Sequence, residues 1–176
     1  MISVRCVLVS GILLLAIYKD YQTFHIPNLL HVAGWLASWT WHVLQGGLVY
    51  GTHCFLMGAV FPIIALWIFF VTHTIGAGDI KLFSVIGSFY GVSFVSETFV
   101  LAVFFAGGMS LFQIIRTHCL VNRLHYLADY LSRVRKHKRL LTYMQTEKVS
   151  QDALIHMSSA IAAGFWATLF AQVVLQ

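Results

Sequence analysis

The sequence predicts an all-α protein, a polytopic membrane bundle of about six transmembrane helices. Hydrophobic residues make up 59% of the 176-residue chain and charged residues only 10%. The mean hydropathy of +0.81 exceeds that of ordinary soluble domains. No Lys, Arg, Asp or Glu occurs in residues 21–78, 82–96, 98–113 and 153–176. Because a transmembrane helix needs about 20 mainly apolar residues, the chain has room for about six.

The predicted helices follow the apolar stretches in chain order. The first is an apolar run that Lys19 and Asp20 close; no small-residue cleavage site follows it, so we expect a retained span rather than a signal peptide. The second starts after Pro27, which suits the first turn of a helix. The full set comprises residues 2–18, 28–45, 53–72, 80–95, 98–115 and 153–174.

A β-barrel is excluded by the distribution of the apolar residues. Residues 55–71 are apolar on every face, whereas strands of a membrane barrel alternate apolar and polar side chains. A helical bundle is the other structure that satisfies its backbone in lipid. No repeat or linker divides the chain, so we expect a single membrane domain over residues 1–176, with a basic connection at about 116–152.

The basic residues predict the orientation of the chain. Lys19, Lys81 and the basic residues of the 116–152 connection fall on alternate connections, and of the eleven basic residues only Arg5 falls on the other side. Cytoplasmic connections carry the excess of Lys and Arg, so we expect a multi-pass protein of the bacterial inner (cytoplasmic) membrane with both termini extracytoplasmic. The net charge of +5 then reports orientation, and no nucleic-acid partner is expected.

The sequence contains no motif typical of a metal or cofactor site. The three cysteines do not form a Cys-x-x-Cys pair, and the nine histidines form neither His-x-x-x-His nor His-Glu-x-x-His. We therefore expect no metal and no cofactor. His25 and His73 are the histidines nearest in sequence to the acids discussed next. A role in tuning the proton affinity of those acids is one explanation for them, and a position at the membrane interface is the other.

Two acids, Asp20 and Asp79, lie at the ends of predicted spans, on connections that both face the cytoplasm. Two neighbouring carboxyl groups can share one proton, because their repulsion and partial desolvation raise one proton affinity and lower the other. Such a pair supplies base and acid together, as peptide hydrolysis requires. Gly76 and Gly78 precede Asp79; they remove side-chain bulk and permit backbone angles closed to other residues, so we expect that a substrate backbone can approach Asp79 closely.

Each segment also has a purely structural explanation. Asp79 precedes a helical run, where free N–H groups and the helix dipole favour an anion, so Gly76-Ala-Gly-Asp79 describes an ordinary turn and helix cap equally well. Lys81 is explained as a positive-inside residue with a stem along apolar surface. The two acids share a proton only if helix packing brings them together, and the sequence does not assign the proton to either.

Taken together, the two segments resemble the type IV prepilin peptidases, aspartic proteases with one Asp on an early connection and a Gly-x-Gly-Asp on a later one. Asp20 with Ile26-Pro27-Asn28 is similar to the first catalytic segment, and Gly76-Ala-Gly-Asp79-Ile-Lys81-Leu to the second. Residues 155–164 are weakly similar to the last span of the family, without its proline. The resemblance implies that Asp20 and Asp79 are catalytic and that Gly76, Gly78, Pro27 and Asn28 shape the site or bind substrate.

The substrate implied by this resemblance is a prepilin or pseudopilin, cut after a glycine at the cytoplasmic membrane boundary. The chain lacks the cysteine-bearing insertion of the larger members and most resembles the short branch that serves Flp or tight-adherence pili, which argues against methyltransferase activity. The alternatives are a protease for preflagellin-like substrates, a non-catalytic membrane assembly scaffold and a small transporter. A transporter normally has ionisable groups near the membrane midplane, where this sequence has none.

Overall fold

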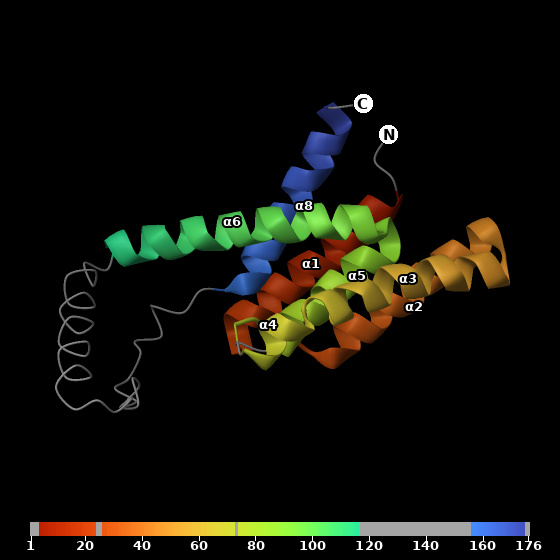
Figure 1. Ribbon diagram of the computed structural model, residues 1–176, viewed down its shortest axis with the longest axis horizontal. Coiled ribbons are helices and arrows are strands. Elements are labelled where there is room, and N and C mark those ends of the chain that lie inside the picture. The colour runs from red at the N-terminus through yellow and green to blue at the C-terminus, as the bar shows by residue number, and fades with distance from the viewer. Residues whose placement is uncertain (1–3, 24–25, 73, 117–155, 175–176) are drawn as a thin grey trace. The chain divides into compact units, whose positions relative to one another are not determined.

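The computed structural model describes residues 4–23, 26–72, 74–116 and 156–174, and every regular element in these ranges is a helix (Figure 1). The predicted all-α fold is therefore confirmed. The chain divides into two compact units, Met1–Phe105 with His156–Gln176, and Ala106–Ile155. Of the second unit the structure describes only residues 106–116, so most of the predicted basic connection lies outside the described residues.

The helices differ from the predicted spans mainly at their ends. Three of them, α3, α6 and α8, combine the length and the apolar composition that crossing a membrane requires. The bundle prediction is thus supported, but α5, with 14 residues, is shorter than the 20 or so that a span needs. The described helices are α1 (Val4–Thr23), α2 (Asn28–Gly46), α3 (Leu48–Ala65), α4 (Trp67–Val71), α5 (Ala77–Tyr90), α6 (Val92–Arg116) and α8 (Met157–Val174).

Two boundaries correct the sequence prediction. The predicted third span, residues 53–72, begins earlier, after Gly47, and is interrupted at Leu66 between α3 and α4. Pro62 lies in the last turn of α3, where its ring removes one helical hydrogen bond. The predicted fourth span, residues 80–95, ends at Tyr90 because Gly91 adopts a φ of 87°, a left-handed conformation that glycine accepts without steric cost and that ends helices.

Helix α5 forms the centre of the first unit. It packs against α1, α2, α3 and α8, and every residue from 82 to 89 is buried. A helix that is covered on all sides is apolar all round, which explains why this segment has no polar face. The hydroxyl of Ser84 donates to the carbonyl of Ala59 (2.7 Å), and the indole of Trp35 donates to Ser84 (3.1 Å). These contacts fix the position of α5, and with it the acid in its first turn.

Helices α3 and α5 approach each other closely where they cross. A Cβ atom added to Gly58 would overlap the carbonyl group of Gly87, and one added to Gly87 would overlap the carbonyl group of Gly58. Gly164 of α8 has a similar role against α6, since its Cβ would lie 2.8 Å from the carbonyl oxygen of Thr98. Small residues at such crossings let helix backbones approach in membrane bundles.

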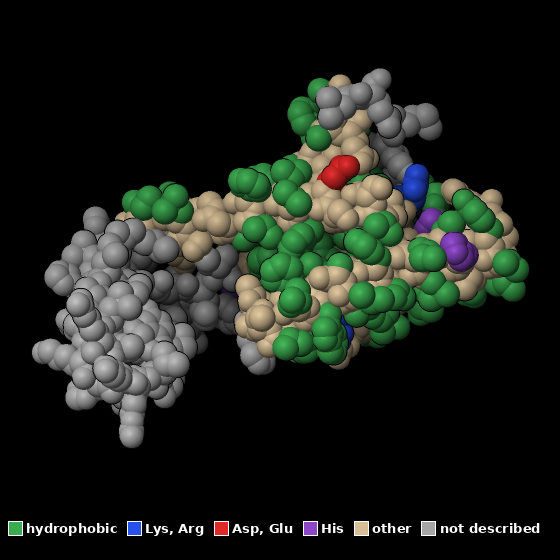
Figure 2. Space-filling view, viewed as in Figure 1, with side chains coloured by type: hydrophobic (Ala, Val, Ile, Leu, Met, Phe, Trp, Pro, Cys, Tyr) green, Lys and Arg blue, Asp and Glu red, His purple; other side chains and the backbone are tan. Residues whose placement is uncertain are grey.

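Large apolar side chains remain exposed along the outer faces of the helices (Figure 2). Leu44 is 80% exposed, Phe104 75% and Phe170 71%, and similar side chains occur on α1, α3 and α4. In water such a surface would be unfavourable, because apolar area gains free energy when it leaves the solvent. The exposed surface is compatible with a protein whose outer faces contact lipid.

Candidate active site

Asp20 lies in the last turn of α1, which continues five residues beyond the predicted end at Tyr18. Its side chain is 14% exposed. Ser158, in the first turn of α8, donates a hydrogen bond from Oγ to Oδ2 of Asp20 over 2.6 Å. The Nδ1 atom of His156 lies 3.4 Å from the same oxygen. Asp20 is therefore held by groups from a helix more than a hundred residues further along the chain.

Asp79 lies in the first turn of α5, outside the three helices of membrane-crossing length. Burial raises the pKa of Asp79 from an ordinary 3.8 to about 6; the neighbouring charge of Asp20 adds to this, and a hydrogen bond from the Gly76 backbone opposes it. An acid whose only role is to cap a helix would have a lowered pKa, because the helix N-terminus favours the ionised form. For Asp79, burial and the charge of Asp20 raise the pKa by more than the hydrogen bond from the Gly76 backbone lowers it.

The two carboxyl groups are neighbours in the fold although 58 residues separate them in sequence. Helix α1 packs against α5, and the charge of Asp20 acts on Asp79 strongly enough to raise its pKa. Helix α8 packs against both. Three helix ends therefore meet at this position: the C-terminal end of α1 and the N-terminal ends of α5 and α8. We call Asp20, Asp79, His156 and Ser158 the carboxylate cluster.

The segment with Pro27 and Asn28 also reaches the start of α5. Lys81 donates from Nζ to Oδ1 of Asn28 over 2.8 Å, which ties the first turn of α2 to that of α5. Pro27 stands just before α2, and its carbonyl accepts the N–H of Leu30 at 3.0 Å. Lys81 therefore has a specific polar partner in addition to the interfacial position that we expect for it.

The two glycines before Asp79 differ in the space around them. Gly76 has a φ of −71°, which any residue adopts, and among the described glycines only Gly47 and Gly91 have positive φ. The lack of a side chain, and not an unusual backbone angle, therefore distinguishes Gly76, since a Cβ there would lie 3.2 Å from Oδ2 of Asp79. A Cβ at Gly78 would make an ordinary van der Waals contact with Ile26, at 3.7 Å.

His156 and Ser158 were missed by the sequence analysis, which considered His25 and His73 instead. Both of those histidines lie outside the described residues. The one available hint was that residues 155–164 resembled a family segment, together with a polar residue at the start of an apolar helix. Within the described ranges, no group of three or more His, Cys, Asp or Glu residues is arranged to hold a metal ion.

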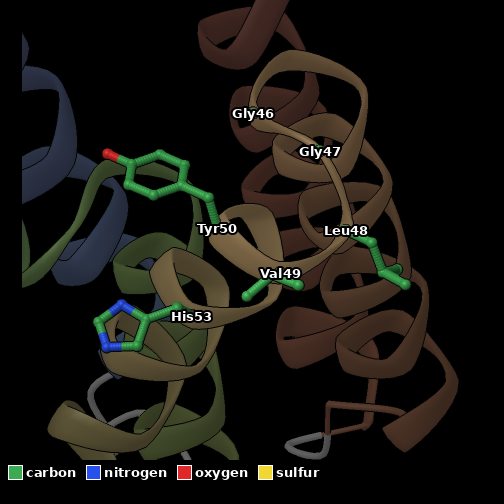
Figure 3. A pocket seen from close by; sticks show the side chains of 6 residues that line it. All are labelled: Gly46, Gly47, Leu48, Val49, Tyr50 and His53. Atoms are coloured by element: carbon green, nitrogen blue, oxygen red, sulfur yellow. The ribbon is translucent and has the colours of Figure 1, made fainter.

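A pocket of about 560 Å³ lies at the turn between α2 and α3, with Tyr50 and His53 on its rim (Figure 3). Its lining residues include no carboxylate, so it lacks the acid–base pair that hydrolysis needs. It is also at the far end of α2 from Asn28, roughly 27 Å along a 19-residue helix. We therefore place the candidate active site at the carboxylate cluster and not at this pocket.

The fold is a helical bundle with three helices long and apolar enough to cross a membrane, and two acids lie at neighbouring helix ends. A model of the type IV leader peptidase family matches residues 7–111, more than half of the chain, and the chain belongs to this family. It is therefore a leader-peptidase-type protease, a hydrolase, and the family implies a prepilin as substrate. Neither the curated proteins nor the solved structures gave a significant match. The matched residues include Asp20 and Asp79 but end before α8.

Proposed function

We propose that this protein is an intramembrane aspartyl endopeptidase that removes the leader peptide of prepilins or pseudopilins, with Asp20 and Asp79 as its catalytic carboxylates. The observation that carries the proposal is that the end of α1 with Asp20 packs against the start of α5 with Asp79, where burial, and in addition the charge of Asp20, raise the pKa of Asp79 to about 6. A buried acid with a raised pKa beside a second acid is typical of catalytic sites. The substrate is of the Flp type and is cut at the cytoplasmic boundary of the bacterial inner membrane.

The proposed reaction needs only the two carboxyl groups and water. The ionised carboxylate takes a proton from water as the water oxygen attacks the peptide carbonyl carbon, and the protonated carboxyl group donates its proton to the carbonyl oxygen. The resulting gem-diol then breaks its C–N bond: the leaving nitrogen takes the proton that the first carboxylate had received from water, and the other carboxylate takes a proton back from a gem-diol hydroxyl as the new carboxyl group forms. Gly76, Gly78, Pro27 and Asn28 shape the space next to the acids.

The orientation belongs to the same proposal. Lys19 precedes Asp20 near the end of α1, and Lys81 lies in the second turn of α5, two residues after Asp79, so each acid has a positive charge near it in sequence. Positive residues concentrate on the cytoplasmic side of a membrane protein. A prepilin leader is itself on that side before cleavage, which puts the scissile bond at the level of the cluster.

The substrate assignment predicts the outcome of a co-expression experiment. In a host without its own leader peptidase, this protein should convert an Flp-type prepilin to a shorter form whose N-terminus follows a glycine. Gel mobility and N-terminal sequencing of the product measure the cleavage. A preflagellin expressed in the same way is the control and should stay uncut. Cleavage of the preflagellin alone would transfer the proposal to that substrate, and no cleavage of either would favour a scaffold or a transporter.

The raised pKa of Asp79 predicts how the rate depends on pH. The reaction needs one protonated carboxyl group, which the pair retains below the Asp79 pKa of about 6 and loses as the pH rises through it. We expect kcat/KM for a prepilin peptide to fall above pH 6, approaching roughly tenfold per pH unit. Initial rates from pH 4.5 to 8.5 in detergent test this. A rate that stays constant from pH 5 to pH 8 would contradict it.

A further inference from the structure

The start of α8 contacts the carboxyl group of Asp20, although no sequence motif pointed to this contact. Ser158 is fully buried, and its hydroxyl donates to Oδ2 of Asp20 over 2.6 Å. His156 approaches the same oxygen to 3.4 Å with Nδ1, and its side chain is 15% exposed. Ser158 therefore donates a hydrogen bond to one oxygen of the carboxylate, and the His156 ring lies beside the same oxygen.

The contact gives the N-terminus of α8 a nearby negative charge and gives Asp20 a hydrogen-bond donor. The first turn of α8 has no acidic residue of its own, although a helix N-terminus favours a negative charge. Asp20 supplies that charge from α1. This contact holds α1 and α8 together. A purely structural contact would not need to involve Asp20, the acid whose charge acts on Asp79.

The hydrogen bond from Ser158 distinguishes Asp20 from Asp79. A hydroxyl donates to an oxygen that carries no proton, so Oδ2 of Asp20 is an acceptor while Ser158 holds it. We infer that Ser158 and His156 are positioning residues that fix Asp20 as the proton-accepting carboxylate and leave Asp79 as the proton donor. The inference rests on the proposed function and adds two residues and two roles to it.

His156 is itself held in place from two sides. Its ring stacks on Tyr21, the residue after Asp20, with the centroids 3.9 Å apart and the planes at 19°. The hydroxyl of Ser159 donates to its carbonyl oxygen over 2.6 Å. The titratable groups that α1, α5 and α8 bring to this point are Asp20, Asp79, His156 and Tyr21. Lys81, also on α5, is engaged by Asn28.

Substitutions of Ser158 test the inference. Ser158→Ala removes the donor, and Ser158→Cys replaces it with a weak donor of similar size. We expect both to lower kcat for a prepilin peptide about tenfold or more, as loss of an orienting partner typically does, with KM changed less than about twofold. Ser158→Thr keeps the hydroxyl and should retain most of the activity. Ser88→Ala is the matched control, because Ser88 is equally buried but donates within its own helix to Val85.

A pair of substitutions separates the two contacts of His156. His156→Phe keeps the stack on Tyr21 but removes the nitrogen that faces Asp20, whereas His156→Asn keeps a side-chain nitrogen and loses the stack. We expect kcat to fall several-fold in the Phe variant and to be retained better in the Asn variant. Equal kcat values in the two, or the reverse order, would show that His156 acts by packing rather than by positioning the carboxylate.

The outcomes separate this inference from the proposed function. If Asp20→Asn and Asp79→Asn are inactive while Ser158→Ala and Ser158→Cys have the kcat of the parent, the positioning role is wrong and the proposed function stands. If both Asn variants cleave at the parental rate, the proposed function itself is wrong. Thermal unfolding in detergent is measured for each variant together with its rate. If Ser158→Thr does not accumulate in membranes, the kcat values of Ser158→Ala and Ser158→Cys are compared with that of Ser88→Ala, and equal values would contradict the positioning role.

Discussion

Replacement of Asp79 by Asn should abolish prepilin processing, with kcat/KM lowered at least about 100-fold, the lower range for loss of a general acid or base. Asn has the same shape and can cap a helix as well as Asp, so the first turn of α5 should remain intact. It cannot give up the shared proton as a carboxyl group does. Asp20→Asn should have an effect of similar size, although its amide oxygen can still accept the hydrogen bond from Ser158.

Glu97→Gln is the matched control for both substitutions. Glu97 is an acid in the same unit whose Oε2 contacts Gln172 at 3.3 Å, between α6 and α8 and apart from the carboxylate cluster. Its variant should process prepilin at the parental rate. The double variant Asp20→Asn, Asp79→Asn should be hardly slower than either single variant, because the two groups act as one unit. Processing above half the parental rate by either Asn variant would end the proposal, provided that membrane fractions contain equal amounts of protein.

Gly58→Ala should destabilise the protein, although Ala is favoured over Gly in a helix interior by about 1 kcal/mol. The added Cβ would overlap the carbonyl group of Gly87, which is backbone and cannot rotate away as a side chain does. Helices α3 and α5 would have to separate, and overpacking of this kind typically lowers the free energy of unfolding by about 1–3 kcal/mol. Gly58→Leu should prevent stable folding altogether. Thermal or denaturant-induced unfolding in detergent measures both effects.

Gly11→Ala provides the control for this prediction. Gly11 lies inside α1, and no atom comes within 4 Å of a Cβ added there. That variant should be as stable as the parent or slightly more stable, because only helix propensity changes. The two alanine substitutions are therefore expected to have opposite signs. A Gly58→Ala protein as stable as Gly11→Ala would mean that α3 and α5 do not approach as closely as the glycine contact indicates.

The sequence predicted the helical class because composition and charge distribution act over the whole chain. It did not predict where α3 begins or where α5 ends, because a single glycine decides each of these two boundaries. Gly47 and Gly91, with φ of 79° and 87°, end one helix and begin the next within apolar stretches where hydropathy does not change. Backbone conformation at one residue leaves almost no trace in an average over twenty.

The candidate site was predictable only in part for a similar reason. Asp20 and Asp79 stand out because acids are rare in this chain, and each lies next to a recognisable turn. Ser158 does not stand out, since serine is common in membrane helices and its importance depends on a partner 138 residues away. Of the two properties of glycine that the sequence offered for Gly76, the lack of a side chain applies, because a Cβ would lie 3.2 Å from Oδ2 of Asp79, whereas its φ of −71° is open to any residue.

The contact between α1 and α8 has a consequence for how the protein becomes active during biogenesis. Ser158 and His156 are translated after both acids, once α1 to α6 have already left the ribosome. A nascent chain therefore carries Asp20 and Asp79 before it carries the groups that hold Asp20. On the proposed roles, a chain in which α8 is not yet beside α1 should cleave more slowly than the complete protein, because nothing yet holds Asp20 in position.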